Sequence, residues 1–296
     1  MKDLRLITIT LAMMTFVACG PIQRTRQSED TPVRTPETEN LLINLKKVSA
    51  RGFMFGHHDD TNYGIGWEGD EGRSDVKSVC GDYPAVISFD LGHIELGDTM
   101  SLDKVPFTKI RKEILNQYKR GGMSSLSWHL RNPLTGGDSW DVSDTTVVKS
   151  ILPGGANHEK FTGWVSKVSA FINSLQTEEG VKVPVLFRPW HEHTGSWFWW
   201  GEKLCTPEEY KALWHMTVDI LRNDGVDNAL YAYSPGSEPQ DTAQYLKRYP
   251  GDELIDLIGF DTYQFERDTY LANLEKSLAI VDSIGKAHNK VIAITE

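Results

Sequence analysis

Short apolar segments alternate with amphipathic helical segments, and this pattern restricts the fold of the 296-residue chain more than any other feature. Apolar runs predict strands at 52–56, 85–89, 123–127, 184–187, 230–233, 257–260 and 291–295. Apolar residues at helical spacing predict helices at 41–48, 110–118, 161–172, 206–221 and 271–281. Such an alternation predicts a parallel sheet covered by helices.

Polar and aromatic residues follow almost every predicted strand, as Asp90, Trp128, Arg188 and Asp261 illustrate. In a (β/α)8 barrel the carboxyl ends of the strands meet at one face, and this face carries the active site. A doubly wound sheet would concentrate its signal after the first strand, yet no GxGxxG motif follows Phe55. We therefore predict the α/β class and a (β/α)8 TIM barrel.

The N-terminus has the pattern of an export signal. Lys2 and Arg5 precede an apolar run at 6–17, which is shorter than the roughly 20 residues needed to cross a bilayer. The run ends in the letters FVACG, which resemble a bacterial lipoprotein cleavage box and make Cys19 the predicted lipidation site. The alternative is a plain secretion signal with a chance cysteine, and both interpretations place the protein outside the cytoplasm.

Three segments follow from these patterns: a lipoprotein signal peptide at 1–19, a flexible polar tether at 20–38 and the barrel domain at 39–296. We expect an exported monomer that is lipid-anchored to a bacterial membrane, on its periplasmic face or at the cell surface. An eight-stranded barrel needs an eighth strand after Glu296, so the barrel is expected to be truncated after strand seven, with its C-terminal part missing. Because such a barrel exposes two sheet edges, we expect this polypeptide alone to be unstable and to have little activity.

Charge and cysteine content exclude several classes of protein. The formal charge of −10 argues against a nucleic-acid partner, since phosphate binding needs a basic face. Cys80 and Cys205 lie 125 residues apart without metal-ligand spacing, so we expect two buried free thiols, although a disulfide is open to them. The cluster at 57–60 (His-His-Asp-Asp) has no second ligand set and is weak evidence for a metal. We expect no metal and no cofactor.

Two glutamates and a tryptophan-rich segment point to carbohydrate chemistry. Glycoside hydrolysis needs two carboxyl groups that flank the scissile bond, and Glu192 and Glu296 each follow a predicted strand. The segment 188–201 (RPWHEHTGSWFWWG) contains four tryptophans, a density that is hard to explain as core. Indole rings stack on the apolar faces of sugars, so the segment predicts a sugar-binding loop.

These residues resemble glycoside hydrolase family 26, chiefly endo-β-1,4-mannanases. The stretches that carry the resemblance run in order through the globular part: GHHDD at 56–60, WE at 67–68, RSDV at 73–76, DYPA at 82–85, FDLGH at 89–93, the segment 188–201, GFDTY at 259–263 and ITE at 294–296. The His-Glu pair followed by Gly-Ser-Trp is the most specific of them. The resemblance covers the chain from about residue 42 to its end.

The resemblance implies a retaining endo-hydrolysis of β-1,4-mannosidic bonds in mannan, glucomannan or galactomannan. It implies Glu192 as acid/base and Glu296 as nucleophile. It also implies contacts to the substrate or the nucleophile from His129, His191, Trp197, Tyr263, Arg188 and Trp140, with Tyr263 and Arg188 on the nucleophile and Trp197 as a sugar platform.

Two alternatives stay open. The first is a relative within the family that is specific for mixed-linkage β-glucan or β-1,3-xylan, because the sequence does not settle the backbone sugar. A non-catalytic carbohydrate-binding lipoprotein would keep the aromatic residues but has no need of both glutamates. The order His191-Glu192-His193 is no zinc-protease motif, since that motif needs its second histidine four positions after the first.

Overall fold

The protein is described by a computed structural model, which covers residues 34–265 and 267–296. Its main sheet is parallel throughout, and its strands lie side by side in the order in which they occur in the chain. They are β1 (Gly56–His58), β4 (Val86–Asp90), β5 (Met123–Ser127), β6 (Val185–Arg188), β7 (Ala229–Tyr233), β8 (Leu257–Phe260) and β9 (Val291–Ile294). A doubly wound sheet reverses its strand order at a switch point, so this sequential order agrees with the predicted barrel topology and excludes the alternative.

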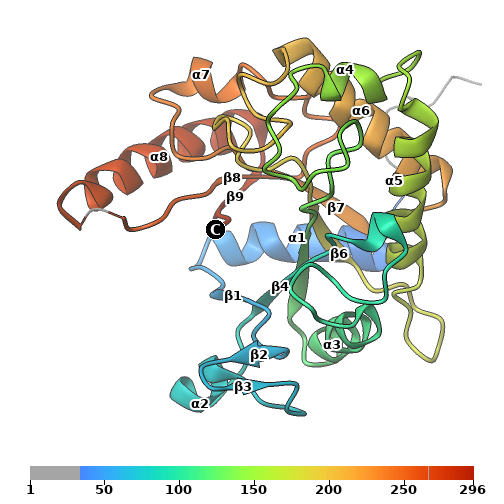
Figure 1. The fold of residues 1–296 in the computed structure, drawn as a ribbon. Coiled ribbons are helices and arrows are strands. Elements are labelled where there is room, and N and C mark those ends of the chain that lie inside the picture. The colour runs from blue at the N-terminus through green and yellow to red at the C-terminus, as the bar shows by residue number, and fades with distance from the viewer. Residues whose placement is uncertain (1–33, 266) are drawn as a thin grey trace, which may run out of the picture. The chain divides into compact units, whose positions relative to one another are not determined.

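Helices connect successive strands of the sheet (Figure 1). They are α2 (Asp75–Cys80), α3 (Phe107–Lys119), α4 (Val147–Ile151), α5 (His158–Asn173), α6 (Pro207–Asn223), α7 (Thr242–Leu246) and α8 (Arg267–His288), with a 3-10 turn η1 (Ile94–Leu96). The helix α6 has the strongest start signal, a capping box between Thr206 and Glu209 with Pro207 in the first turn. Among the described residues, no helix is both long enough and apolar enough to span a membrane.

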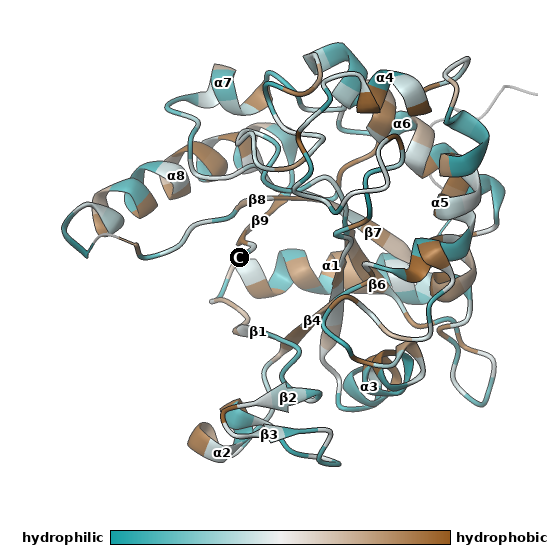
Figure 2. Cartoon of the chain, viewed as in Figure 1, coloured by the Kyte–Doolittle hydropathy of each residue, from teal (hydrophilic) through white to brown (hydrophobic). Residues whose placement is uncertain are grey.

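Several strands, among them β4 and β7, are apolar over much of their length and are brown in Figure 2. Side chains such as Phe89, Leu126 and Phe187 pack with the covering helices in the larger core. Their neighbours on the opposite face form a second core with Leu45 of α1 (Pro36–Ser49). That second core contains Met123, Leu186, Leu230, Ala232, Leu257 and Val291.

The inner face of the sheet changes from apolar to polar along each strand. Side chains two positions apart share a face, so Leu186 in the inner core shares its face with Arg188, and Met123 shares its face with Ser127. The same alternation places Val86, which packs against the inner core, on the face of Asp90. The carboxyl ends of the strands therefore direct polar side chains to one inner rim.

The helix α1 begins at Pro36, five residues before the helix start that the sequence predicts, so residues 36–38 of the expected tether are helical. Thr35 is the N-cap, and its hydroxyl accepts a hydrogen bond from the amide of Thr38 at 3.2 Å. Pro36 fits the first helical turn because its missing N–H would have no partner there. A Thr-Pro pair that looks like a linker is here a helix start. The predicted signal peptide, Cys19 and most of the tether lie outside the described residues.

The prediction for the first strand is also wrong, both in its bounds and in its burial. Residues 52–55 form no strand, and β1 is an exposed three-residue edge strand that pairs only with β4. Phe53 is 89% exposed, so the apolar run there is not a buried strand. The sequence also missed the hairpin of β2 (Tyr63–Gly64) and β3 (Trp67–Glu68) and the short helices α2, α4 and α7. Elements of two to six residues have too few positions to show a period.

The two cysteines in the described part of the chain are both free. Cys205 is buried, as expected, whereas Cys80 is exposed at the end of α2, so the prediction of two buried thiols is wrong for Cys80. The helix α2 has no buried residue, and this explains the exposure.

Candidate active site

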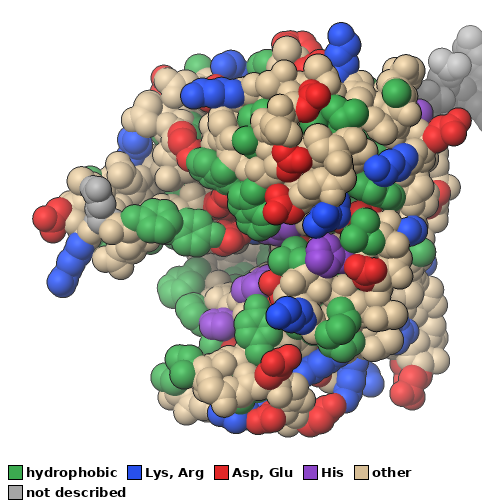
Figure 3. All heavy atoms as spheres, viewed as in Figure 1, with side chains coloured by type: hydrophobic (Ala, Val, Ile, Leu, Met, Phe, Trp, Pro, Cys, Tyr) green, Lys and Arg blue, Asp and Glu red, His purple; other side chains and the backbone are tan. Residues whose placement is uncertain are grey.

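Acidic, histidine and aromatic side chains gather in a recess on one face of the molecule (Figure 3). The recess lies where the carboxyl ends of the parallel strands meet, and it contains both predicted carboxyl groups. One carboxylate oxygen from each of Glu192, Asp261 and Glu296 lies within 4.8 Å of the other two. Strands distant in sequence thus supply one compact set of ionisable groups.

Glu296 follows β9 and has two side-chain donors. Arg188 at the end of β6 donates to its Oε2 at 2.5 Å, and the Tyr263 hydroxyl donates to its Oε1. Burial alone would raise the pKa of Glu296, but the Arg188 charge and these hydrogen bonds hold it below its usual value. Glu296 is therefore a carboxylate with both oxygens held in place.

Asp261 is a site residue that the sequence analysis did not select. It is 3% exposed at the end of β8, and its Oδ2 accepts from Nη1 of Arg188 at 2.8 Å. Burial raises the pKa of Asp261 to about 7, although Arg188 acts against this rise. Its place directly after a buried strand is the signal that would have identified it, because the same argument selected Glu296. Arg188 thus links two carboxylates, and it also donates to the Ser234 hydroxyl at 3.2 Å.

Glu192 lies on the loop after β6 and faces Glu296. The indole N–H of Trp197 donates to its Oε2 at 2.6 Å. An indole N–H can only donate, and a carboxylic acid accepts best at its carbonyl oxygen, so the favoured position for the proton of a protonated Glu192 is Oε1. Burial raises the pKa of Glu192; Glu296 acts in the same direction, and the bond from Trp197 acts against it. The two glutamates therefore have pKa values shifted in opposite directions.

The loop that carries Glu192 has an unusual backbone. Trp190 has φ 55° and Glu192 has φ 51°, a left-handed region that residues other than glycine rarely adopt. Hydrogen bonds hold this conformation: the Glu192 amide donates to the Ser234 carbonyl at 2.8 Å, and the Tyr210 hydroxyl donates to the Trp190 carbonyl at 2.7 Å. Backbone strain of this kind persists only where the surroundings enforce it, and it concentrates at functional sites.

His129 and His191 lie together beside the two glutamates. Their Nε2 atoms are 3.0 Å apart, and Nδ1 of His129 lies 2.7 Å from Oδ2 of Asp90. Trp140 stacks on His129 with ring centroids 5.4 Å apart and is 51% exposed, so its outer face is open to a ligand. The structure thus brings all eight predicted substrate-site and catalytic residues to one rim, together with Asp261 and Asp90.

The tryptophans of the 188–201 segment differ from their predicted role. Trp190, Trp199 and Trp200 have no exposed surface, whereas Trp197 is 40% exposed. The idea that this density is hard to explain as core is therefore wrong for three of the four. They pack against one another with centroid distances of 5.1 to 5.6 Å and support the strained loop. Trp197 alone among the four is placed to meet a sugar.

Within the described residues, two groups of side chains have a spacing that a metal ion could use. In the set of Glu192, Asp261 and Glu296, the guanidinium of Arg188 forms ion pairs with Asp261 and Glu296 and so supplies a positive charge beside the carboxylates. In the second set, Nε2 of His58 lies 3.4 Å from Asp59 and 4.0 Å from Asp103, and these carboxylates raise the pKa of His58 although burial acts to lower it. The cluster at 57–60 that the sequence showed contributes His58 and Asp59 to that second set.

Comparison with known proteins gives the family. Residues 31–293 match the model of glycosyl hydrolase family 26. The chain belongs to this family. A mannan endo-1,4-β-mannosidase of Bifidobacterium adolescentis is 34% identical over 88% of this chain, and one of Bacillus subtilis is 28% identical over 75% of it. The chain spans 27% and 59% of the lengths of these two relatives.

Solved structures agree with this assignment to family 26. A family 26 β-mannanase from Bacteroides ovatus has a TM-score of 0.88 at 62% identity, over 88% of this chain and 76% of that one. An endo-β-1,4-mannanase from Cellulomonas fimi has a TM-score of 0.82 at 35% identity, over 89% of this chain and 60% of that one. The predicted family and the barrel-type α/β fold are both confirmed. Glu296 lies just beyond the matched range of the family 26 model, so its contacts with Arg188 and Tyr263 are the evidence for its role.

Proposed function

We propose that this protein hydrolyses internal β-1,4-mannosidic bonds in mannan, glucomannan or galactomannan with retention of configuration. The observation that carries the proposal is the opposed pair of glutamates, with carboxylate oxygens within 4.8 Å. Retaining glycosidases have carboxyl groups about 5–5.5 Å apart, whereas inverting enzymes need about 6.5–9.5 Å to admit a water molecule. The family and the mannanase relatives support mannan as the substrate.

In the proposed reaction Glu296 is the nucleophile and Glu192 is the acid/base. Glu192 protonates the leaving oxygen while Glu296 attacks the anomeric carbon and forms a covalent glycosyl-enzyme. Glu192, then ionised, takes a proton from water, which attacks the same carbon and releases Glu296. Arg188 and Tyr263 hold Glu296 ionised and oriented for the first step, and Trp197 directs the Glu192 proton to Oε1. Trp197 and Trp140 supply exposed aromatic faces for the sugar.

Proton NMR of early products, before mutarotation, tests the stereochemistry. Mannohexaose cleaved by a retaining endo-enzyme yields β-configured new reducing ends in shorter oligosaccharides. A first product with α configuration overturns the double displacement. Parallel digests of galactomannan, lichenan and β-1,3-xylan identify the backbone sugar, and binding of mannan without any cleavage would instead indicate a carbohydrate-binding protein.

The pH dependence follows from the two pKa shifts. The pKa of Glu296 lies below its usual 4.5, so we expect kcat/KM to fall as the pH drops through that lowered value and the nucleophile becomes protonated. The pKa of Glu192 lies above 4.5, so kcat/KM is expected to fall as the pH rises through that value and the acid loses its proton. A bell-shaped profile of kcat/KM, with its limbs on either side of 4.5, is the expected result. A profile that is flat through the acid range would contradict the assignment.

We also propose that the protein is exported as a lipid-anchored monomer. The support is the basic start, the short apolar run and the FVACG box, which makes Cys19 the modified residue. Expression in a bacterium fed labelled palmitate tests this, with Cys19→Ala as the matched control. Label and membrane fractionation are expected for the natural chain and are lost in the variant. A natural chain that takes up no label overturns the anchor.

A further inference from the structure

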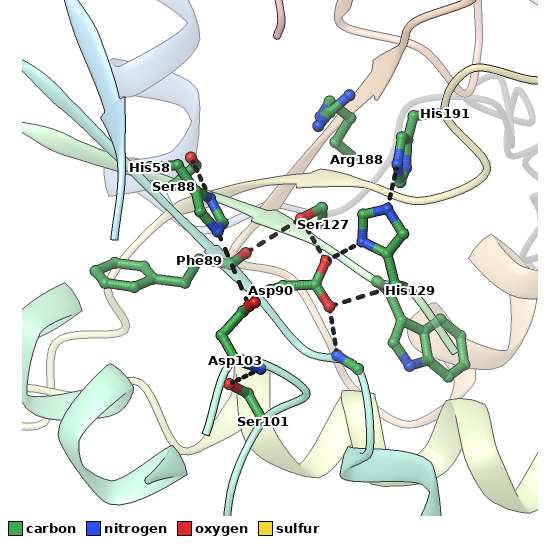
Figure 4. A network of polar contacts seen from close by, with 12 residues as sticks. His58, Ser88, Phe89, Asp90, Ser101, Asp103, Ser127, His129, Arg188 and His191 are labelled. Atoms are coloured by element: carbon green, nitrogen blue, oxygen red, sulfur yellow. Dashed lines mark hydrogen bonds and ion pairs between the residues drawn. The ribbon is translucent and has the colours of Figure 1, made fainter. Parts of the chain in front are cut away.

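Asp90 is a buried carboxylate in contact with the active site, and it takes no part in the proposed reaction of Glu192 and Glu296. It ends β4, is 3% exposed and accepts four hydrogen bonds. Its Oδ1 accepts from the amides of Gly92 at 2.6 Å and His129 at 3.2 Å, while its Oδ2 accepts from the Ser127 hydroxyl at 2.6 Å and lies 2.7 Å from Nδ1 of His129. Figure 4 shows the carboxylate between Ser127 and His129, with His191 on the far side of the His129 ring.

The contacts of Asp90 determine which nitrogen of His129 carries a proton. Burial alone would raise the pKa of Asp90, but His129, Ser127 and Gly92 hold it well below its usual range, so the group is ionised. An ionised carboxylate only accepts hydrogen bonds, so Nδ1 of His129 is the donor. Nε2 of His129 therefore faces His191, and the ring cannot exchange its two nitrogens without losing the Asp90 contact.

The proton position of His129 determines the tautomer of His191. When His129 is neutral, its Nε2 has a lone pair and accepts from Nε2–H of His191 at 3.0 Å. The Nδ1 atom of His191 is buried, and within the described residues it has no hydrogen-bond partner. With the proton on that atom instead, the Nε2 lone pairs of the two rings would face each other at 3.0 Å without a hydrogen bond, at a cost in stability. The arrangement with Nδ1 protonated on His129 and Nε2 protonated on His191 avoids this cost.

We propose that Asp90 is a positioning residue of the reaction, which fixes the orientation, tautomer and charge of His129 and, through it, the tautomer of His191 at the cleavage site. The proposal rests on the proposed glycosidase function only for its kinetic readout. His129 stacks under Trp140 and lies beside His191, the residue before the acid Glu192. A change in its proton position therefore changes the donors and acceptors that the bound sugar meets.

The charge on His129 is set by groups from several strands. Burial lowers its pKa, while Asp90 and, less strongly, Glu296 raise it and Arg188 lowers it; the net direction is upward. On the opposite side of Asp90, its charge also contributes to the raised pKa values of His58 and Tyr63. The ionisable groups that face the pair are Arg188, His191, Glu296, His58 and Tyr63. Asp90 is the charged group in direct contact with the His129 ring, so we expect its removal to change the pKa of His129 more than removal of any of the others.

Asp90→Asn tests the proposal because it keeps the shape and changes the hydrogen-bonding pattern. The Asn oxygen still accepts from the Gly92 and His129 amides, and its NH2 group can donate to the Ser127 hydroxyl. The NH2 group can no longer accept from His129, so the proton of His129 is expected to move to Nε2. Nitrogen-15 NMR of the histidines reads this directly: Nδ1–H in the natural protein, Nε2–H in the variant, with the pKa of His129 lower by about 1–3 pH units.

Kinetics supply the second readout. Removal of a partner that orients a metal-bound histidine typically lowers activity about 10–100-fold. By analogy, we expect Asp90→Asn to lower kcat/KM on mannan by about the same factor. In a His129→Asn background, Asp90→Asn is expected to cause less than about a threefold further change, because its effect passes through His129. Glu95→Gln is the matched control: Glu95 is also buried and accepts from Trp128 and the Arg131 amide without touching either histidine. It is expected to leave the tautomer of His129 unchanged.

The outcomes of these experiments either support or overturn the positioning role of Asp90. Equal losses from Asp90→Asn in both backgrounds, or an unchanged tautomer, overturn the proposal and leave Asp90 a structural residue. If the variant does not fold, the spectrum of the natural protein still decides, because neutral His129 with its proton on Nε2 contradicts the argument. A natural protein that cleaves no mannan refutes the proposed function, while the NMR titration still tests the role of Asp90.

Discussion

Glu296→Gln is expected to lower kcat/KM on mannan by about 10⁴-fold or more, a loss of the size seen when a covalent nucleophile is removed. The amide has nearly the shape of the carboxylate but lacks the charge that attacks the anomeric carbon. It also leaves the buried Arg188 with one carboxylate partner, Asp261, instead of two. Initial rates of reducing-end release from mannan measure the effect.

The matched control for this variant is Glu275→Gln, which makes the same chemical change on the exposed surface of α8. We expect its kcat/KM to equal that of the natural protein. Thermal unfolding of both variants separates a catalytic loss from a loss of folded protein. Activity of Glu296→Gln within about tenfold of the natural protein would exclude Glu296 as the nucleophile, because a covalent step tolerates no such substitution.

Arg188 explains how two acidic groups can lie so near Glu192. Its guanidinium is buried and bonds both Asp261 and Glu296, and their charges keep it protonated. Asp261 has no contact with Glu192 among the hydrogen bonds described, and it acts by holding Arg188 in place. The pKa of Glu192 remains raised because burial and the Glu296 charge outweigh the indole bond and the more distant cations. The division of roles between the glutamates is thus set by which of them Arg188 touches.

The sequence predicted the strands from β4 to β9 to within a residue or two, because most of them are buried parallel strands with a short apolar run. β5 is the exception in composition, since it contains three serines, and β9 is only partly buried. The same argument failed for the first strand, where Phe53 and Phe55 are apolar but exposed next to an edge strand. The start of α1 was missed because a Thr-Pro pair such as Thr35-Pro36 occurs in linkers as well as at helix starts. Burial and capping depend on tertiary neighbours that a local pattern does not contain.

For the site, the position of residues after strands was enough to select both glutamates, and the family resemblance added Arg188 and Tyr263. The pattern did not separate platform tryptophans from core ones, since Trp197 and Trp199 differ by two positions yet one is exposed and the other is fully buried. A strained loop turns them in different directions, and no periodicity describes such a loop. Asp261 and Asp90 were visible as strand-end residues, but their partners lie 73 and 39 positions away in the chain.

Glu192→Gln is expected to lower kcat/KM on mannan by about 10²–10⁴-fold, the usual contribution of general acid catalysis. The loss depends on the leaving group. A poor leaving group such as a sugar hydroxyl needs the proton, whereas a dinitrophenyl mannoside departs without it, so glycosylation of Glu296 by the activated substrate is expected to stay fast. The covalent intermediate then accumulates, because its hydrolysis needs Glu192 as base, and intact-protein mass spectrometry detects it. Glu202→Gln, an exposed change on the same loop, is the control. Equal losses on both substrates, with no intermediate, would show that Glu192 does not supply the proton.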